Sequence, residues 1–364
     1  MTTLLEARYR AVLRLLPAYY RREREEEMVE TYLWDIDRAT QDQSRPTFGE
    51  VASVAALAVR SRLGGPGAPR RYVLLGSSAR HFALFAVLLQ AAAAVVDRSL
   101  ELTWAFTRGA EGRHLFLTGF TGRSPSATVF AVLTWTLPLL WTVAWFALVH
   151  GRPRLARSAA LGAALPTLWP LLGPLVADTV PPDPLYGTAT ALLAWLSALT
   201  LCAAQHRDAP PTRSPLGSPG QVLLACCVVM GASVVLFPYT ADAVWAPATG
   251  FVVGAVGWLL WRTRGTDRTS PGAALALAAL GLLILAVRLA ALRPWLHVPG
   301  ARSSAAASGR RRRSPCSSRP WRWWAAGISP GAEGGCPDRR PLSAGTPGAA
   351  AAAAARHGSR RRPY

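Results

Sequence analysis

The densest group of ionisable side chains is an unbroken run of charged residues from Arg21 to Glu27. Arg21 and Glu25 are four residues apart, as are Arg22 and Glu26, so a helix would place each pair side by side. Neighbouring carboxylates act as a general acid and base where an apolar pocket raises one pKa, and no apolar segment encloses this run. The run therefore indicates either a solvated helix face or a docking surface for a protein partner. The candidate docking residues are Arg21, Arg22, Glu25, Glu26 and Met28.

The five cysteines do not form a metal or redox motif, because no two of them have the C-x-x-C spacing. Three lie in apolar segments, where a thiol packs as a small hydrophobic group. The chain also contains no glycine-rich phosphate loop, no H-E-x-x-H zinc motif and no G-x-S-x-G nucleophile motif. We therefore expect no metal, no cofactor and no enzymatic activity.

The middle of the chain is predicted to form apolar helices in a lipid bilayer. Hydrophobic residues make up 51% of the 364 residues and charged residues only 16%, well below the quarter that is usual in soluble proteins. A helix needs about 20 apolar residues to cross the hydrocarbon core, and about seven stretches approach that length. We therefore predict an all-α fold with a polytopic transmembrane helical bundle over residues 72–292. The predicted spans are residues 73–96, 127–149, 159–180, 185–204, 221–237, 244–261 and 273–292.

Residues 1–66 are predicted to form a small three-helix domain of their own. Thr3 and Glu6, and again Thr47 and Glu50, have the spacing of a capping box, which begins a helix. Pro17 suits the first turn of the middle helix, and apolar residues recur at helical spacing in all three. The predicted core stripes are Leu5, Tyr9, Val12 and Leu16, then Val29, Tyr32, Leu33 and Ile36, then Val51, Val54, Ala55 and Ala58.

The sequence around the charged run carries a family resemblance. The stretch from Tyr9 to Met28 reads Y-R-x-x-L-R-L-L-P-x-x-Y-R-x-E-x-E-E-E-M. It resembles the N-terminal helical domain of actinobacterial membrane proteins and is similar to the HAAS-like and permease-prefix families. The resemblance covers under a fifth of the chain and carries no chemistry of its own. It implies a membrane-tethered signalling or regulatory protein, in some cases paired with a PadR-like transcription regulator, or a prefix on a transport permease.

Arginine counts predict the orientation of the spans. All forty basic residues are Arg, a usage typical of GC-rich bacterial genomes. With the N-terminus in the cytoplasm, thirteen Arg flank the inner ends of the spans and four lie in outer loops, in line with the positive-inside rule. Residues 1–34 lack the apolar core of a signal peptide, so the first span would act as the insertion signal. We therefore expect a multi-pass protein of the bacterial plasma membrane with a cytoplasmic N-terminus.

Ionisable residues inside spans often mark function, because burying them in lipid is costly. Few are present in this chain: Arg288, Asp178 and His81 lie in or near predicted spans. We expect the Arg288 side chain to reach the membrane surface along its helix, and Asp178 and His81 to lie at the interface. The spans therefore offer no acid or histidine relay for a proton-coupled transporter.

Residues 293–364 differ in amino-acid composition from the rest of the chain. Fourteen of the forty Arg lie there among Ala, Pro, Gly and Ser, with too few aliphatic residues for a core, so we expect a disordered tail. After seven spans the arginines of this tail would lie outside the membrane, which is opposite to the arginine bias of the earlier loops. We favour a reading-frame change near residue 300 as the origin of the tail. An Arg run beside tryptophans can bind nucleic acid or anionic lipid. Because most of the excess positive charge of the chain lies in this one tail, we do not expect a nucleic-acid partner.

Two kinds of function fit this organisation. The first is a membrane-tethered regulatory or interaction protein, because a charged helical domain precedes spans that lack intramembrane chemistry. The alternative is a transport permease or permease subunit, because Pro166, Pro170 and Pro174 should kink or partly break the third span. Broken helices mark substrate sites in many transporters.

Overall fold

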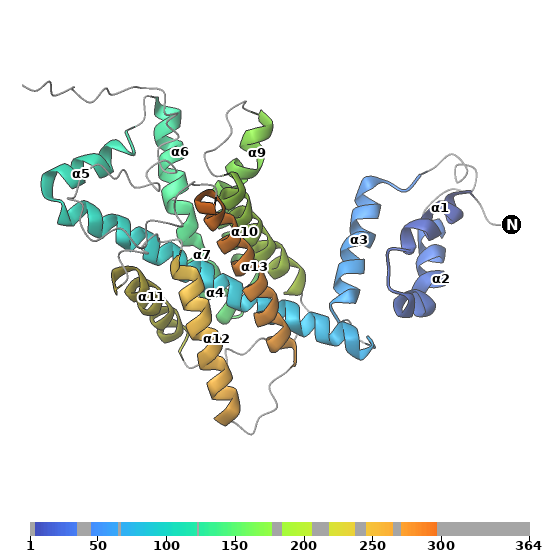
Figure 1. Ribbon diagram of the computed structural model, residues 1–364. Helices are drawn as coiled ribbons and strands as arrows, with labels where there is room; N and C mark the ends of the chain where they lie inside the picture. The colour runs from blue at the N-terminus through green and yellow to red at the C-terminus, as the bar shows by residue number, and fades with distance from the viewer. Residues whose placement is uncertain are drawn as a thin grey trace, which may run out of the picture. The chain divides into compact units, whose positions relative to one another are not determined.

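The computed structural model describes residues 4–34, 45–64, 67–121, 124–176, 184–205, 218–236, 245–264 and 271–296 (Figure 1). The regular structure within these ranges is entirely helical and includes no strand, which confirms the all-α fold class. Some sequence-based expectations concern residues outside these ranges: Thr3, Ile36, Asp178, Cys316, Cys336 and the tail beyond residue 296.

Three helices near the N-terminus share one apolar core: α1 (Leu4–Leu13), α2 (Ala18–Trp34) and α3 (Phe48–Arg62). They are referred to below as the N-terminal three-helix group. Its buried cluster consists of Tyr9, Leu13, Leu16, Val29, Val54 and Ala58. The predicted stripes supply all of these except Leu13, which is fully buried.

The capping box at the start of α3 is confirmed. The Thr47 hydroxyl accepts a hydrogen bond from the Glu50 N–H at 3.3 Å, and the Glu50 carboxylate accepts one from the Thr47 N–H at 2.7 Å. Two backbone donors that have no partner within the helix are satisfied in this way, which fixes where α3 begins.

Within the described ranges, five helices are long and apolar enough to cross a membrane, which indicates a membrane protein. They are α4 (Arg70–Thr107), the segment Pro125–Val149, α10 (Pro184–Ala204), α11 (Pro219–Leu236) and α13 (Pro271–Leu296). These coincide with the first, second, fourth, fifth and seventh predicted spans. The apolar part of α12 (Ala246–Arg264) is shorter, and the third predicted span, residues 159–180, extends past residue 176, where the described range ends. The count of seven spans therefore stays a prediction.

Helices α4 and α6 to α13 are called the membrane-type helices below. Two consecutive helical segments among them each contain a 3-10 turn at a proline. The first consists of α6 (Pro125–Thr136), η1 (Leu137–Leu139) and α7 (Leu140–Val149), and the second of α8 (Pro153–Ala164), η2 (Leu165–Thr167) and α9 (Leu168–Val176). Pro138 lies in η1 and Pro166 in η2, because proline has no N–H for the i→i−4 hydrogen bond. The expected break in the third span is observed, and the break at Pro138 was not expected.

The two interrupted helices form an antiparallel pair. Gly151, with a φ of 69°, makes the turn that joins α7 to α8, a backbone conformation that side chains disfavour. Helices α7 and α8 pack against each other, and η1 contacts η2. The two proline turns therefore lie at the same level of this helix pair.

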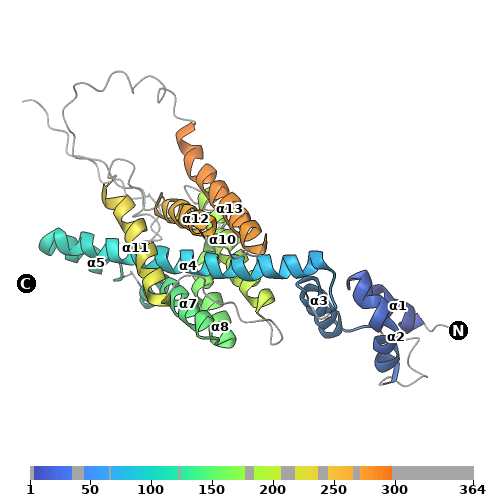
Figure 2. The same ribbon diagram turned by 90° about the horizontal axis from the view of Figure 1, so that it is seen from below.

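Helix α4 supplies much of the core of the membrane-type helices, because it packs against α13, α10, α7 and α11 (Figure 2). Its 38 residues extend about 57 Å at the helical rise, so it is longer than the predicted span 73–96. The helix continues past Val96 to Thr107 because no glycine or proline lies between Val96 and Gly109, and because Arg98 and Glu101 form an ion pair at 2.6 Å one turn apart. A short helix, α5 (Gly109–Thr118), follows.

Arg288 departs from the sequence-based expectation. Helix α13 continues beyond it to Leu296, and the residue is 8% exposed instead of extending along the helix to the surface. Its guanidinium lies over the Trp245 ring, 3.9 Å from the centroid, and this contact holds it inside the protein. His81 lies in α4 with Nδ1 2.8 Å from the Ser77 carbonyl, and its interfacial position stays a prediction.

Candidate docking site

The five predicted docking residues lie on α2, but their expected pairing is wrong. Among the described residues, no ion pair joins Arg21 to Glu25 or Arg22 to Glu26. Glu25 and Glu26 contact Arg10 of α1 instead. The pattern of charges on one helix therefore did not predict their partners, because a neighbouring helix offered a better one.

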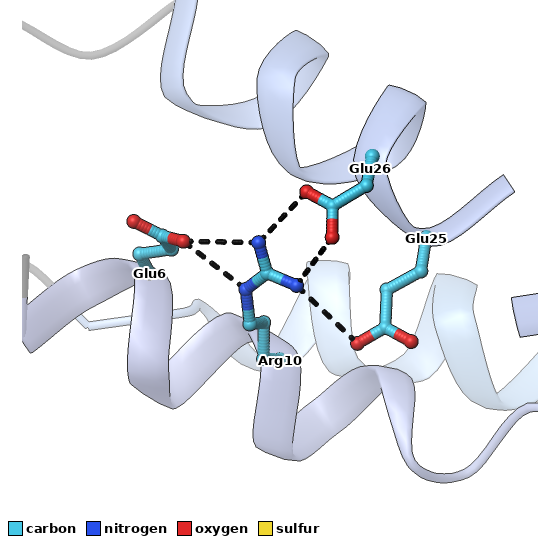
Figure 3. A network of polar contacts seen from close by, with 4 residues as sticks. All are labelled: Glu6, Arg10, Glu25 and Glu26. Carbon is cyan, nitrogen blue, oxygen red and sulfur yellow. Dashed lines mark hydrogen bonds and ion pairs between the residues drawn. The ribbon is translucent and has the colours of Figure 1, made fainter. Parts of the chain in front are cut away.

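Arg10 is the centre of an ion-pair network that joins α1 to α2 (Figure 3). Its Nη1 and Nη2 atoms donate hydrogen bonds to the two carboxylate oxygens of Glu26, each at 2.8 Å. A planar guanidinium favours this two-bond geometry, which explains why Glu26 turns to Arg10. The Nε atom donates to Glu6 at 3.1 Å, one turn earlier on α1, and a Glu25 oxygen lies 3.8 Å from Nη1.

The network shifts the ionisation of its members. The hydrogen bond from Arg10 lowers the pKa of the Glu26 carboxyl, and the bonds to Glu26 and then Glu6 raise the pKa of the Arg10 guanidinium. Both side chains are open to solvent, so water and salt screen the attraction between them. The main effect of the network is therefore to hold α1 and α2 in one register.

Arg10→Gln is expected to reduce the pH dependence of stability in the N-terminal three-helix group. The pKa of Glu26 is lower in the folded chain than in the unfolded chain, so its contribution is present above the unfolded pKa and is lost as pH falls through the folded pKa. The wild type should therefore lose more stability than Arg10→Gln on going from neutral pH into the range where carboxylates titrate. Helical circular dichroism during thermal unfolding at a series of pH values measures this difference.

The matched control is Arg14→Gln, since Arg14 is an exposed arginine next to α1 and forms no ion pair among the described residues. It should keep the pH dependence of the wild type. Identical pH profiles for Arg10→Gln and Arg14→Gln would contradict the assignment of Arg10 as the network centre.

A groove of about 440 Å³ opens in the N-terminal three-helix group. Aromatic rings, a leucine and a thioether give it apolar walls, and three charged side chains lie along its edges. The lining residues are Tyr9, Tyr20, Arg24, Glu27, Met28, Thr31, Tyr32, Glu50 and Leu57. Met28 is the predicted docking residue that the structure places in this groove, and Arg21 and Arg22 belong neither to the groove nor to the Arg10 network.

The wall of the groove is built from two stacked tyrosines. The rings of Tyr9 and Tyr32 lie 4.0 Å apart between centroids and are parallel within 7°. The Tyr32 hydroxyl donates a hydrogen bond to Glu50 Oε2 at 3.1 Å, the same oxygen that accepts the Thr47 N–H in the capping box. The wall is therefore continuous with the start of α3, because one Glu50 oxygen accepts from both Tyr32 and the Thr47 N–H.

The groove suits contact recognition better than acid or base chemistry. Burial, followed by the hydrogen bond to Glu50, raises the pKa of Tyr32 to about 12, and burial likewise raises the pKa of Tyr9. Both phenols therefore stay protonated at neutral pH, and the wall offers uncharged aromatic surface to a partner. Within the described ranges, no group of three His, Cys, Asp or Glu side chains is arranged to hold a metal ion.

Sequence reasoning missed most of the groove. It recognised Glu50 as a cap and Tyr9 and Tyr32 as core residues, but not their shared role as a wall. No protein-family model, curated protein or solved structure matches this chain. The resemblance of the Tyr9–Met28 stretch to prefix domains therefore stays a prediction.

Proposed function

We propose that this chain is a membrane-tethered regulatory or interaction protein whose N-terminal three-helix group is a cytoplasmic docking domain. If the chain has seven spans, the arginine counts of the loops favour an N-terminus inside, which would hold this group at the inner face of the bacterial plasma membrane. The observation that carries the proposal is the groove with the Tyr9–Tyr32 wall and Met28. A partner protein would be recruited to the membrane by binding there.

The groove favours an amphipathic helix with basic residues as its occupant. Tyrosine faces and the adaptable Met28 thioether suit apolar side chains one helical turn apart. The exposed face of α2 carries more acidic than basic side chains: Glu23, Glu26, Glu27 and Glu30 against Arg22 and Arg24. This charge would speed association with a basic partner. The family resemblance makes a PadR-like transcription regulator one candidate for that partner.

Photocrosslinking on the full-length protein in its native membrane tests the proposal. A photoreactive phenylalanine analogue replaces Thr31, which lines the groove, and in a second strain replaces Ala56, an exposed residue of α3 outside the groove. We expect a discrete crosslinked protein from position 31 and not from position 56. Adding Met28→Glu to the first variant should reduce that product about tenfold, because a carboxylate replaces the apolar contact.

Equal crosslinking from the two positions, or a product that Met28→Glu leaves unchanged, would reject the groove as a docking site. The identity of the captured protein also separates the two candidate functions. A DNA-binding regulator would support the first, whereas an ATP-hydrolysing transport subunit would support the alternative of a permease or permease subunit. The contact between the proline turns η1 and η2 favours that alternative, because paired interruptions occur at transporter substrate sites.

A further inference from the structure

Arg288 is the most unusual polar side chain of the membrane-type helices. It lies in α13 between apolar neighbours, and only 8% of the residue is exposed. Its Nη1 and Nη2 atoms are both buried and have no hydrogen-bond partner within the described part of the chain. A guanidinium with unpaired donors in such a place is costly, because desolvation removes the water that would satisfy it.

The Trp245 ring satisfies one face of this guanidinium but not its edge. Cation–π contact, at 3.9 Å between the guanidinium carbon and the ring centroid, stabilises the charge from above the plane. The N–H donors lie in the plane of the guanidinium and point away from its faces. The edge formed by Nη1 and Nη2 is therefore left for an acceptor with two oxygens, in the fork geometry that carboxylates and phosphates adopt.

Two helix starts lie beside the same side chain. Trp245 immediately precedes α12, and Tyr186, in the first turn of α10, lies within electrostatic range of the guanidinium. The first N–H groups of a helix have no partner within the helix and carry its positive dipole end. Helices α10 and α12 both pack against α13, and Trp245 and Tyr186 bring their first turns near the Arg288 side chain, where the positive potentials add.

We infer that Arg288, together with the N-terminal ends of α10 and α12, binds a phosphate group among the membrane-type helices, an inference that goes beyond the proposed docking function. The phosphate oxygens accept the two Nη donors, and the Trp245 ring covers the guanidinium face. The phosphate belongs either to the headgroup of an anionic lipid or to a free anion from solution, and the chemistry of recognition is the same for both.

Thermal unfolding of the full-length protein in uncharged detergent tests this site. One arm adds phosphatidylglycerol with a neutral glycolipid as its comparison, and the other adds inorganic phosphate with chloride at equal ionic strength. We expect at least one of the two phosphate compounds to raise the unfolding temperature of the wild type. Arg288→Gln should weaken its apparent affinity about tenfold or more, because the paired charged hydrogen bonds are lost.

Arg293→Gln is the matched control, since it removes an exposed arginine from the same helix and should leave the affinity unchanged. Arg288→Lys covers the case in which Arg288→Gln does not fold, because it keeps the charge and loses the two-bond fork, and it should also weaken binding. A response to the lipid alone identifies a headgroup as the source, and a response to inorganic phosphate identifies a free anion.

Three results would overturn the inference. The first is that neither phosphate compound stabilises the wild type. The second is that Arg288→Gln and Arg288→Lys respond to phosphate as the wild type does. The third concerns three aspartates in neighbouring segments of the sequence, outside the described residues: Asp178, Asp183 and Asp242. If neutralising one of them lowers the unfolding temperature as much as Arg288→Gln does, and phosphate has no effect, the anion that pairs with Arg288 belongs to the chain itself.

Discussion

Leu13→Ala is expected to destabilise the N-terminal three-helix group by about 2–5 kcal/mol, the range measured for buried leucines. Leu13 is fully buried in the cluster that α1, α2 and α3 share, and its loss leaves a cavity that neighbouring side chains fill only in part. A group of this size has a small core and a net stability of roughly 5 kcal/mol, so the change removes a large share of it.

The rate of limited tryptic cleavage measures this effect in the full-length protein in detergent. Arginines of α2 are protected while the helix is packed, and they should be cut many times faster in Leu13→Ala. The membrane-type helices should resist as before, because their buried residues form a separate cluster. Leu15→Ala is the control, since Leu15 is 43% exposed two residues away, and equal cleavage of the two variants would refute the assigned core.

Gly272→Ala is the second substitution with a large expected effect, a loss of about 1–3 kcal/mol in the stability of the membrane-type helices. Gly272 is the second residue of α13 and faces α4, which packs extensively with α13. A Cβ there would lie 2.6 Å from Ser77 Oγ, 2.8 Å from Ser77 Cβ and 3.0 Å from the Ser78 backbone nitrogen. The backbone atom has no rotamer to change, so one helix must move away from the other.

The control for this substitution is Gly257→Ala in α12, where a Cβ meets no atom within 4 Å. Both changes replace a helical glycine by alanine, which by itself does not destabilise a helix, so a loss of stability in Gly272→Ala alone reports the helix contact. Unfolding temperature in uncharged detergent should fall for Gly272→Ala and stay level or rise for Gly257→Ala. A Gly272→Ala variant as stable as Gly257→Ala would show that α4 and α13 do not pack in this way.

The membrane-type helices were predictable from the sequence because their signal is local. A stretch of apolar residues near the length of the bilayer core must satisfy its own backbone, and an α-helix does so within one segment. The capping box from Thr47 to Glu50 and the break at Pro166 are local in the same sense, since each depends on residues within one turn. Pro138 carried an equally local signal for a second break, which sequence reasoning overlooked.

The tertiary structure decided what depends on partners that are distant in the sequence. Arg10 binds Glu26 across sixteen residues, and Arg288 lies on Trp245, which immediately precedes α12, so no spacing rule within one helix anticipates either contact. The expected pairs Arg21–Glu25 and Arg22–Glu26 were wrong for this reason. Helical periodicity sets which side chains share a face of one helix, and only the packing of helices decides which faces meet and which polar groups become buried.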